Sequence, residues 1–142
     1  MVHALSEIRR VLVEGGLMID LRPILDHWPI EVASARGTRQ TGRFQDLPLG
    51  TADDQVANRS MAQAEQDGWF IREQEHFFLF SYSWDTPSEM EEWIEEEWND
   101  FIRLEDEAGQ ATRSAWASAD ADARVQIKVK MLITRWKVVK GL

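Results

Sequence analysis

Three side chains that could carry acid–base chemistry follow one short apolar run. Asp20, Arg22 and His27 lie at or just after the end of Leu17–Leu21, on the side where α/β sheets usually bind ligands. A carboxylate and an imidazole placed together can act as a general base and the group that orients it. We favour the simpler interpretation, in which Asp20 and Arg22 pair with each other or cap backbone groups.

Aromatic residues offer a second kind of chemistry, because the chain contains seven tryptophans. Large rings can line a pocket for a planar or apolar ligand, but they also dominate cores and interfaces. Several rings fall near the ends of expected elements, and packing in the core or at a dimer interface is the interpretation we favour for them. The candidate residues for a pocket or interaction site are Asp20, Arg22, His27, Trp28, Tyr82 and Trp84.

Other reactive side chains lack the spacing that their chemistry requires. The chain has no cysteine, which excludes a disulfide scaffold, a thiolate zinc site and a cysteine nucleophile. His3 and His76 lie far apart in sequence, and Asp120 and Asp122 are not followed by the remainder of a calcium loop. We therefore assign no catalytic, cofactor-binding or metal-binding residue.

Composition bounds the class of protein. The 142 residues, 44% of them hydrophobic and 29% charged, predict one globular domain over residues 1–142. A net charge of −9 argues against binding to nucleic-acid phosphates. No apolar run is long enough to span a membrane. We therefore expect an acidic, soluble, cytoplasmic protein.

The first half of the chain predicts a helix, a strand, a hairpin and a second helix. Leu5, Ile8 and Leu12 share one helical face that Gly15-Gly16 ends, and Leu17–Leu21 follows as a strand covered on both faces. The alternation within residues 30–45 indicates a hairpin that turns at residues 36–38. The second helix is capped near Thr51 and carries a weak inner stripe.

The second half predicts two long strands with helices between them. Residues 69–82 are rich in aromatic and β-branched residues, which is typical of a strand. Thr86 and Glu89 form a capping box around Pro87 and begin a helix. A further helix is expected over residues 114–123. Residues 125–139 alternate as a half-buried strand whose inner positions are Val125, Ile127, Val129, Met131 and Ile133.

Residues 4–20 carry a resemblance to a known family. They are similar to the helix-to-strand passage late in class I S-adenosylmethionine-dependent methyltransferases, where a helix "L-x-E-x-x-R-V-L" meets a "K-P-G-G" turn and the fifth strand. Val13-Glu14 replaces the usual Lys-Pro. The matching residues are Leu5, Glu7, Arg10, Val11, Leu12, Gly15 and Gly16.

The resemblance implies a fold and the absence of the family's cofactor-binding site. It implies an α/β or α+β fold with a partial Rossmann-like sheet, in which residues 69–82 and 125–139 are the last two strands and the final strand lies antiparallel beside Leu17–Leu21. The family's Gly-rich cofactor loop has no counterpart here, because the sequence contains no G-x-G-x-G. We therefore expect the C-terminal half of a methyltransferase-like domain, without autonomous methyl transfer. S-adenosylmethionine is expected only if the other half is supplied.

Three functions remain open at this point. We favour a non-catalytic, methyltransferase-derived module that acts through dimerisation or a protein partner. The expected homodimer uses the bare apolar edge near Leu17–Leu21, since such edges tend to pair. One alternative is part of an active methyltransferase, completed by preceding sequence or another subunit. The other is an α+β domain that binds a small ligand.

Overall fold

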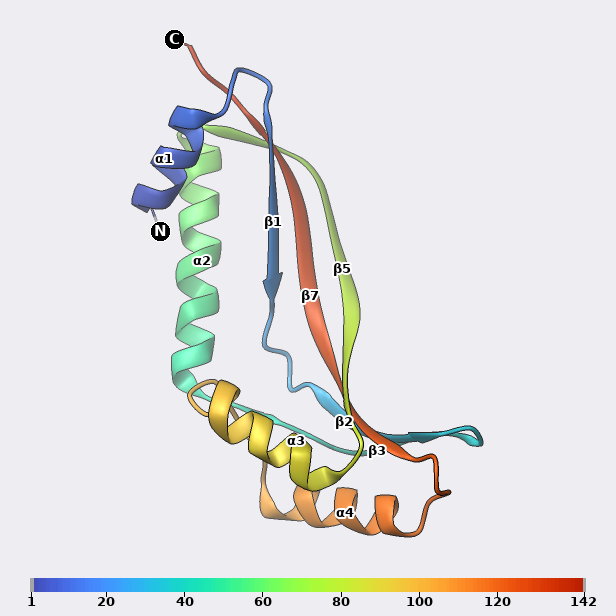
Figure 1. Cartoon of the computed structure of the whole chain (residues 1–142). Coiled ribbons are helices and arrows are strands. Elements are labelled where there is room, and N and C mark those ends of the chain that lie inside the picture. The colour runs from blue at the N-terminus through green and yellow to red at the C-terminus, as the bar shows by residue number, and fades with distance from the viewer. Residues whose placement is uncertain (1, 142) are drawn as a thin grey trace. The chain divides into compact units, whose positions relative to one another are not determined.

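The computed structural model describes residues 2–141 and contains both helices and strands (Figure 1). Within these residues β7 pairs with β1, β2 and β5, and β2 also pairs with β3. Every pairing whose register is described is antiparallel. The α+β class is therefore present, whereas a Rossmann-like arrangement stays a prediction. The helices are α1 (Val2–Val11), α2 (Pro48–Gln66), α3 (Pro87–Trp93), the π-helical turn η1 (Ile94–Trp98) and α4 (Asp106–Ala117). The strands are β1 (Leu17–Pro23), β2 (Pro29–Ser34), β3 (Gly37–Arg43), β4 (Gln45–Asp46), β5 (Phe70–Trp84), β6 (Ile102–Arg103) and β7 (Arg124–Val138).

The described residues form two compact units. Unit 1 consists of residues 2–24, 52–78 and 131–141, and unit 2 of residues 25–51 and 79–130. The long elements α2, β5 and β7 contribute residues to both units. Whether the chain behaves as one domain stays a prediction.

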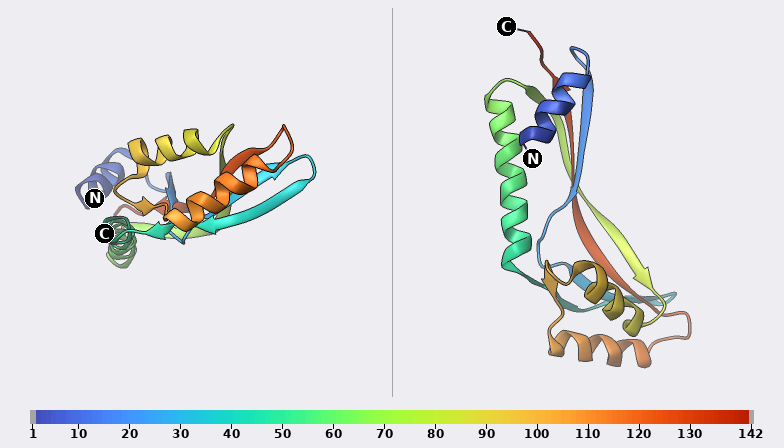
Figure 2. Two further views of the ribbon diagram at one scale, coloured as in Figure 1. Left: turned by 90° about the horizontal axis from the view of Figure 1, so that it is seen from below. Right: turned by 60° about the vertical axis from the view of Figure 1, so that its left-hand side comes forward.

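Unit 1 packs two helices on one face of a strand pair. β1 and β7 are antiparallel, with register from Leu17 opposite Lys137 to Pro23 opposite Met131. Opposite residues in such a pair share a face, so Met18 lies on the face of Trp136. That face lies against α1 and α2 (Figure 2). Its buried core consists of Leu5, Met61, Ala64, Phe70, Trp136 and Val138.

The start of α2 differs from the prediction. The helix begins at Pro48, and Thr51 lies in its first turn, where its hydroxyl is 3.4 Å from the Leu47 carbonyl oxygen. Of the predicted inner stripe, Met61 and Ala64 are buried, whereas Val56 is 46% exposed. Proline suits a first helical position because a backbone N–H at that position would have no intrahelical acceptor, so its loss costs nothing there. The local acidic residues therefore did not mark the true start.

Unit 2 packs α4 against the β2–β3 hairpin. The predicted hairpin is present, but its turn lies at residues 35–36 and not at 36–38, with Ser34 opposite Gly37. Figure 2 shows α4 (orange) lying along the hairpin (cyan). α4 begins eight residues before the predicted position of 114. Its buried side is made of Gly109, Thr112 and Ala115, and such small residues give no apolar periodicity in the sequence.

The predicted capping box at the start of α3 is confirmed. The backbone N–H of Glu89 donates to Oγ1 of Thr86 at 3.2 Å, and the Glu89 carboxylate accepts from the backbone N–H of Asp85 at 3.2 Å. Pro87 occupies the first turn. The helix is shorter than predicted by the apolar stripe Met90, Ile94, Trp98, Phe101 and Ile102, because η1 ends at Trp98 and Ile102 lies in β6.

β7 changes the phase of its buried residues along its length. In unit 2 the predicted inner positions Val125, Ile127 and Val129 are at most 1% exposed. In unit 1 the buried residues are Leu132, Thr134, Trp136 and Val138 instead, so Met131 and Ile133 are only half-buried. Unit 1 therefore buries the positions that strict alternation assigns to the polar side.

None of the helices formed by residues 2–141 is both long and apolar enough to cross a membrane.

Candidate functional site

The residues that the sequence singled out are divided between the units. Asp20 and Arg22 lie on β1 in unit 1, whereas His27, Trp28, Tyr82 and Trp84 belong to unit 2. Each unit therefore has its own set of candidate contacts.

Asp20 and Arg22 form an ion pair on the helix-covered face of β1. They are two residues apart, so their side chains leave the strand on the same side. Nε of Arg22 donates to Oδ1 and Oδ2 of Asp20 at 3.1 and 3.2 Å. Nη2 of Arg22 donates to Oδ1 of Asn58 on α2 at 3.2 Å. The favoured pairing is confirmed, and the Asp20 carboxylate is engaged by its neighbour.

A cavity of about 300 Å³ lies in unit 1, lined by residues of α2, β1, β5 and β7. Two nitrogen atoms of its lining residues, Nη1 of Arg22 and Nε1 of Trp136, are buried and have no hydrogen-bond partner among residues 2–141. Nearly all buried polar groups in proteins are paired, and leaving a donor unsatisfied costs about 1–3 kcal/mol. Each of these nitrogens has less than 1 Å² of accessible surface, so both lie in the packed wall of the cavity.

The other polar groups of the cavity are matched with one another. Nη2 of Arg72 donates to Glu65 at 3.2 Å, and Nη1 donates to Glu75 at 3.4 Å. The hydrogen bond to Glu65, the charge of Glu65 and then Glu75 raise the pKa of Arg72 above its ordinary value. The guanidinium carbon also lies 5.7 Å from the centre of the Trp136 ring. The hydroxyl of Thr134 donates to Glu75 at 3.1 Å.

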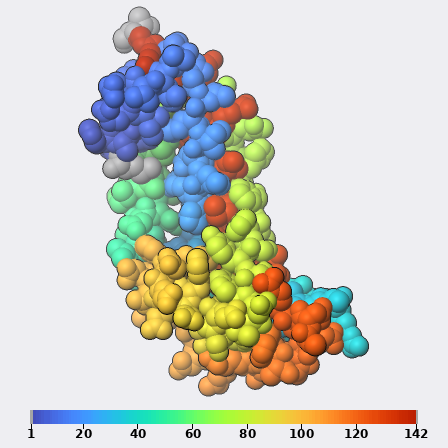
Figure 3. Space-filling view, viewed as in Figure 1, coloured from blue at the N-terminus to red at the C-terminus, as the bar shows by residue number. Residues whose placement is uncertain are grey.

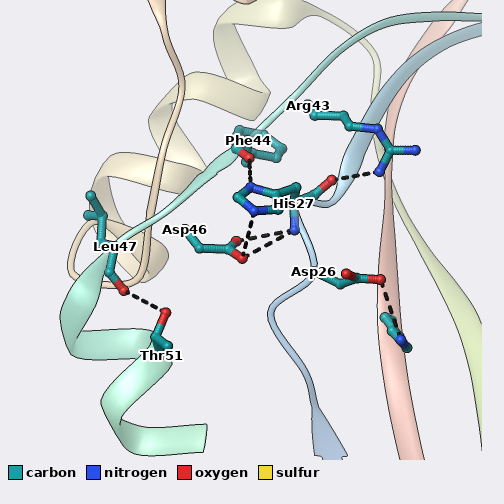
Figure 4. Close-up of polar contacts among 8 residues, drawn as sticks. Asp26, His27, Arg43, Phe44, Asp46, Leu47 and Thr51 are labelled. Carbon is teal, nitrogen blue, oxygen red and sulfur yellow. Dashed lines mark hydrogen bonds and ion pairs between the residues drawn. The ribbon is translucent and has the colours of Figure 1, made fainter.

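His27 fixes the segment that precedes β2 (Figure 4). Its φ of 48° is left-handed, and its backbone N–H lies 3.3 Å from both carboxylate oxygens of Asp46. Nδ1 is 3.2 Å from the Phe44 carbonyl oxygen, and Nε2 is 3.7 Å from Oδ2 of Asp46. The guanidinium of Arg43 donates to the His27 carbonyl oxygen at 3.0 Å. Both ring nitrogens therefore face protein acceptors, which suits a structural role.

Trp28, Tyr82 and Trp84 meet in one aromatic cluster of unit 2. Trp98 joins it, with its ring centroid 5.0 Å from that of Tyr82 and 5.4 Å from that of Trp28, both edge-on. Tyr82 and Trp84 stack at 6.2 Å. Trp28 is 5% exposed. Edge-on and stacked rings at such distances stabilise a core by packing, as the favoured interpretation expects.

The sequence did not reveal how Trp93 joins this cluster. Trp93 and Trp98 are five residues apart, which places them on different faces of an α-helix with 3.6 residues per turn. The π-helical turn η1 widens the spiral there, and the two rings lie 6.2 Å apart. Trp136 was among the rings expected near element ends but not among the candidate site residues, and the phase change in β7 removes the alternation that would have placed it inside.

The other face of the β1–β7 pair in unit 1 carries apolar side chains that this unit leaves accessible. Leu17, Ile19 and Leu21 are 52%, 57% and 53% exposed, and part of β1 is visible at the surface in Figure 3 (blue). The prediction of a strand covered on both faces is wrong for this chain, since the helices of unit 1 pack on one face. We call the exposed side the open face: its apolar residues are Leu17, Ile19, Leu21, Met131 and Ile133, and it also carries Arg135 opposite Ile19 and Lys137 opposite Leu17.

Comparison with protein-family models, curated proteins and solved structures finds no match to this chain. Within residues 2–141, no group of three or more His, Asp or Glu side chains is arranged to hold a metal ion.

Proposed function

We propose that this chain is a non-catalytic interaction module that forms a homodimer through β1. The open face carries the proposal, because three of its large apolar side chains are more than half exposed on one short strand. Contiguous apolar surface of this kind marks sites of association in folded proteins. The second edge of β1 also has no strand partner among residues 2–141, and such edges pair readily with another chain.

A second copy suits this edge because a strand can pair with itself about a two-fold axis. Antiparallel pairing centred on Leu21 places Leu21 opposite Leu21 of the second copy. Asp20 then lies opposite Arg22 of the second copy, so opposite charges meet across the interface. The apolar residues of both open faces then become lateral neighbours on one side of a continuous sheet, which covers part of each side chain.

Light scattering at low micromolar concentration tests the dimer. We expect a mass of twice 16.4 kDa for the natural chain. Ile19→Lys or Leu21→Lys should give the monomer mass, because a charge on the open face opposes its burial. Val13→Lys is the matched control, since Val13 is 74% exposed and precedes β1. A monomeric natural chain, or an Ile19→Lys protein that remains dimeric, contradicts the proposal.

The strand arrangement supports descent from a class I methyltransferase. β7 pairs with both β1 and β5, and it is antiparallel to β1, as the resemblance implies for the last strands of that fold. The module lacks the Gly-rich sequence that approaches the cofactor, so we assign it no methyl transfer of its own. Saturable binding of S-adenosylhomocysteine to this chain would instead favour the alternative, a part of an active methyltransferase.

A further inference from the structure

The end of β5 in unit 2 is an unpaired strand edge. Residues 79–84 of β5 belong to this unit, and β7 is the only strand that pairs with β5 among residues 2–141. Within the same range, the backbone groups of residues 79–84 make no hydrogen bond outside that pairing. Proteins usually protect such edges with charged side chains or proline. Residues 79–84 contain neither, whereas the part of β5 in unit 1 carries Arg72, Glu73 and Glu75.

One face of this edge is aromatic and lies beside α3. Phe80, Tyr82 and Trp84 share that face, because alternate residues of a strand point to the same side. The ring of Trp93 in α3 lies 6.3 Å from the rings of both Tyr82 and Trp84, and Figure 3 shows α3 (yellow) at the surface beside β5 (yellow-green). Phe80 is 49% exposed and Trp93 is 36% exposed. Accessible rings of this kind can contact the stem and the charged head of a lysine or arginine.

Charge on the same side selects a cationic partner. Exposed carboxylates that form no ion pair within residues 2–141 precede and follow Trp93 in the sequence: Glu92, Glu95, Glu96 and Glu97. Unit 2 contains 16 acidic and 8 basic side chains, whereas unit 1 contains 9 and 8. A second copy of unit 2 at this edge would bring two acidic surfaces together, which is unfavourable, and a cationic segment would be attracted.

The opposite face of this edge selects apolar side chains. Leu79 is 63% exposed there, and Nζ of Lys128 donates to the hydroxyl of Ser81 on the same face. A lysine of a partner would meet the charge of Lys128 on this face, whereas an apolar side chain would cover part of Leu79. Successive side chains of a strand point to opposite faces, so a strand that alternates cationic and apolar residues matches both sides of the edge.

We infer that the edge of β5 in unit 2 binds an extended cationic segment of another protein, in which lysine or arginine alternates with apolar residues. The backbone of this segment pairs with the outward backbone groups of residues 79–83. Its cationic side chains lie on the face of Phe80 and the glutamates that flank Trp93, and its apolar side chains lie on the face of Leu79. The site consists of residues of unit 2 alone, so it does not depend on the dimer proposed through β1 in unit 1.

Nuclear magnetic resonance of the full ¹⁵N-labelled chain tests the site with a synthetic probe, an end-blocked peptide of alternating lysine and valine. We expect saturable binding, with slower hydrogen exchange at alternate backbone amides of residues 79–83 because the added strand accepts from them. A peptide of alternating glutamate and valine should bind at least about tenfold more weakly, since its charge is repelled. A peptide with the lysines and valines in separate blocks keeps the charge but loses the alternation, and it should also bind at least about tenfold more weakly.

Two exposed leucines of unit 2 provide a matched pair of variants. Leu79→Lys places a charge where the inference expects an apolar contact, so affinity for the lysine–valine peptide should fall at least about tenfold. Leu49→Lys changes the charge of the unit equally, at a position on α2 that is 53% exposed, and affinity should fall less than about threefold. Glu92→Gln combined with Glu96→Gln should weaken binding at least about threefold. An unchanged remainder of the spectrum verifies the fold of each variant.

The dimer and the peptide site can fail separately in these experiments. Ile19→Lys lies in unit 1, so it should bind the peptide as the natural chain does, whether or not the natural chain is a dimer. The inference is overturned if the lysine–valine peptide does not bind saturably, or if the glutamate or block peptide binds equally well. It is also overturned if exchange at residues 79–83 is unchanged, or if Leu79→Lys or the double glutamine variant binds normally.

Discussion

The two units cover their strands in different ways. In unit 2, α4 packs on β2 and β3 and the Thr41 and Thr112 hydroxyls meet at 2.6 Å. In unit 1 the helices cover one face of β1, and the opposite face leaves Leu17, Ile19 and Leu21 more than half exposed. Both buried side-chain donors that lack a partner in residues 2–141 also belong to unit 1. Among the described residues, the buried side-chain donors of unit 2 are thus paired, whereas unit 1 retains two unpaired donors and an accessible strand face.

The largest expected contrast comes from placing a lysine in each unit. Val32 on β2 is 5% exposed and packs with Ala115 and Ala123, so Val32→Lys should cost more than about 4 kcal/mol by burying an unpaired charge. Ile19→Lys should leave the monomer folded, because that position is 57% exposed. Urea unfolding followed by circular dichroism measures both.

Protein concentration sharpens this test. A dimer is stabilised by mass action, so the unfolding midpoint of the natural chain should rise with concentration. The midpoint of Ile19→Lys should not. If the midpoints of both proteins are independent of concentration, the open face has no role in association.

A smaller effect is expected from the hydroxyl pair in unit 2. Thr112 is fully buried, and its hydroxyl donates to the Ala108 carbonyl oxygen at 2.8 Å while contacting Thr41. Thr112→Val keeps the shape and removes these bonds, so it should destabilise the protein by about 1–2 kcal/mol. Thr51→Val, at an exposed position with one long contact of 3.4 Å, is the control and should cost less than about 0.5 kcal/mol. An equal loss of unfolding free energy in the two variants would show that the buried hydroxyl pair contributes no more to stability than the exposed contact of Thr51.

The smallest expected change in stability comes from removing one indole N–H in each unit. Site-specific replacement of tryptophan by benzothienylalanine keeps the bicyclic ring and removes the N–H. At Trp116, whose Nε1 lies 3.1 Å from the Asp85 carbonyl oxygen, we expect a loss of about 1 kcal/mol. At Trp136, whose Nε1 has no partner within residues 2–141, we expect no loss or a small gain. Thermal unfolding measures both, and an equal loss at Trp136 would argue that its N–H is already satisfied.

Local signals in the sequence predicted elements where neighbouring residues decide the structure. Thr86, Pro87 and Glu89 begin α3 as predicted, because a capping box satisfies backbone groups within a few residues. The β2–β3 hairpin was also predicted, because its two strands are joined by a turn of a few residues. The pairing of Asp20 with Arg22 was also predictable, since residues two apart on a strand share a face.

Elements held by small or irregular contacts were harder to predict. α4 buries glycine, threonine and alanine, which carry no strong hydrophobic period. The start of α2 at Pro48 was missed because the acidic residues after Thr51 imitate a helix start. The meeting of Trp93 and Trp98 depends on a π-helical turn that no spacing rule for an α-helix anticipates.

By itself, the sequence determined the type of most elements, the apolar character of β1 and the absence of a Gly-rich cofactor loop, because each depends on residues close together in the chain. Only the tertiary structure decided which apolar residues are buried. The buried residues of β7 change phase after Lys130, which turns Trp136 toward the helices and leaves Ile133 on the open face. Burial depends on what packs against each side of a strand, and those neighbours come from distant parts of the sequence.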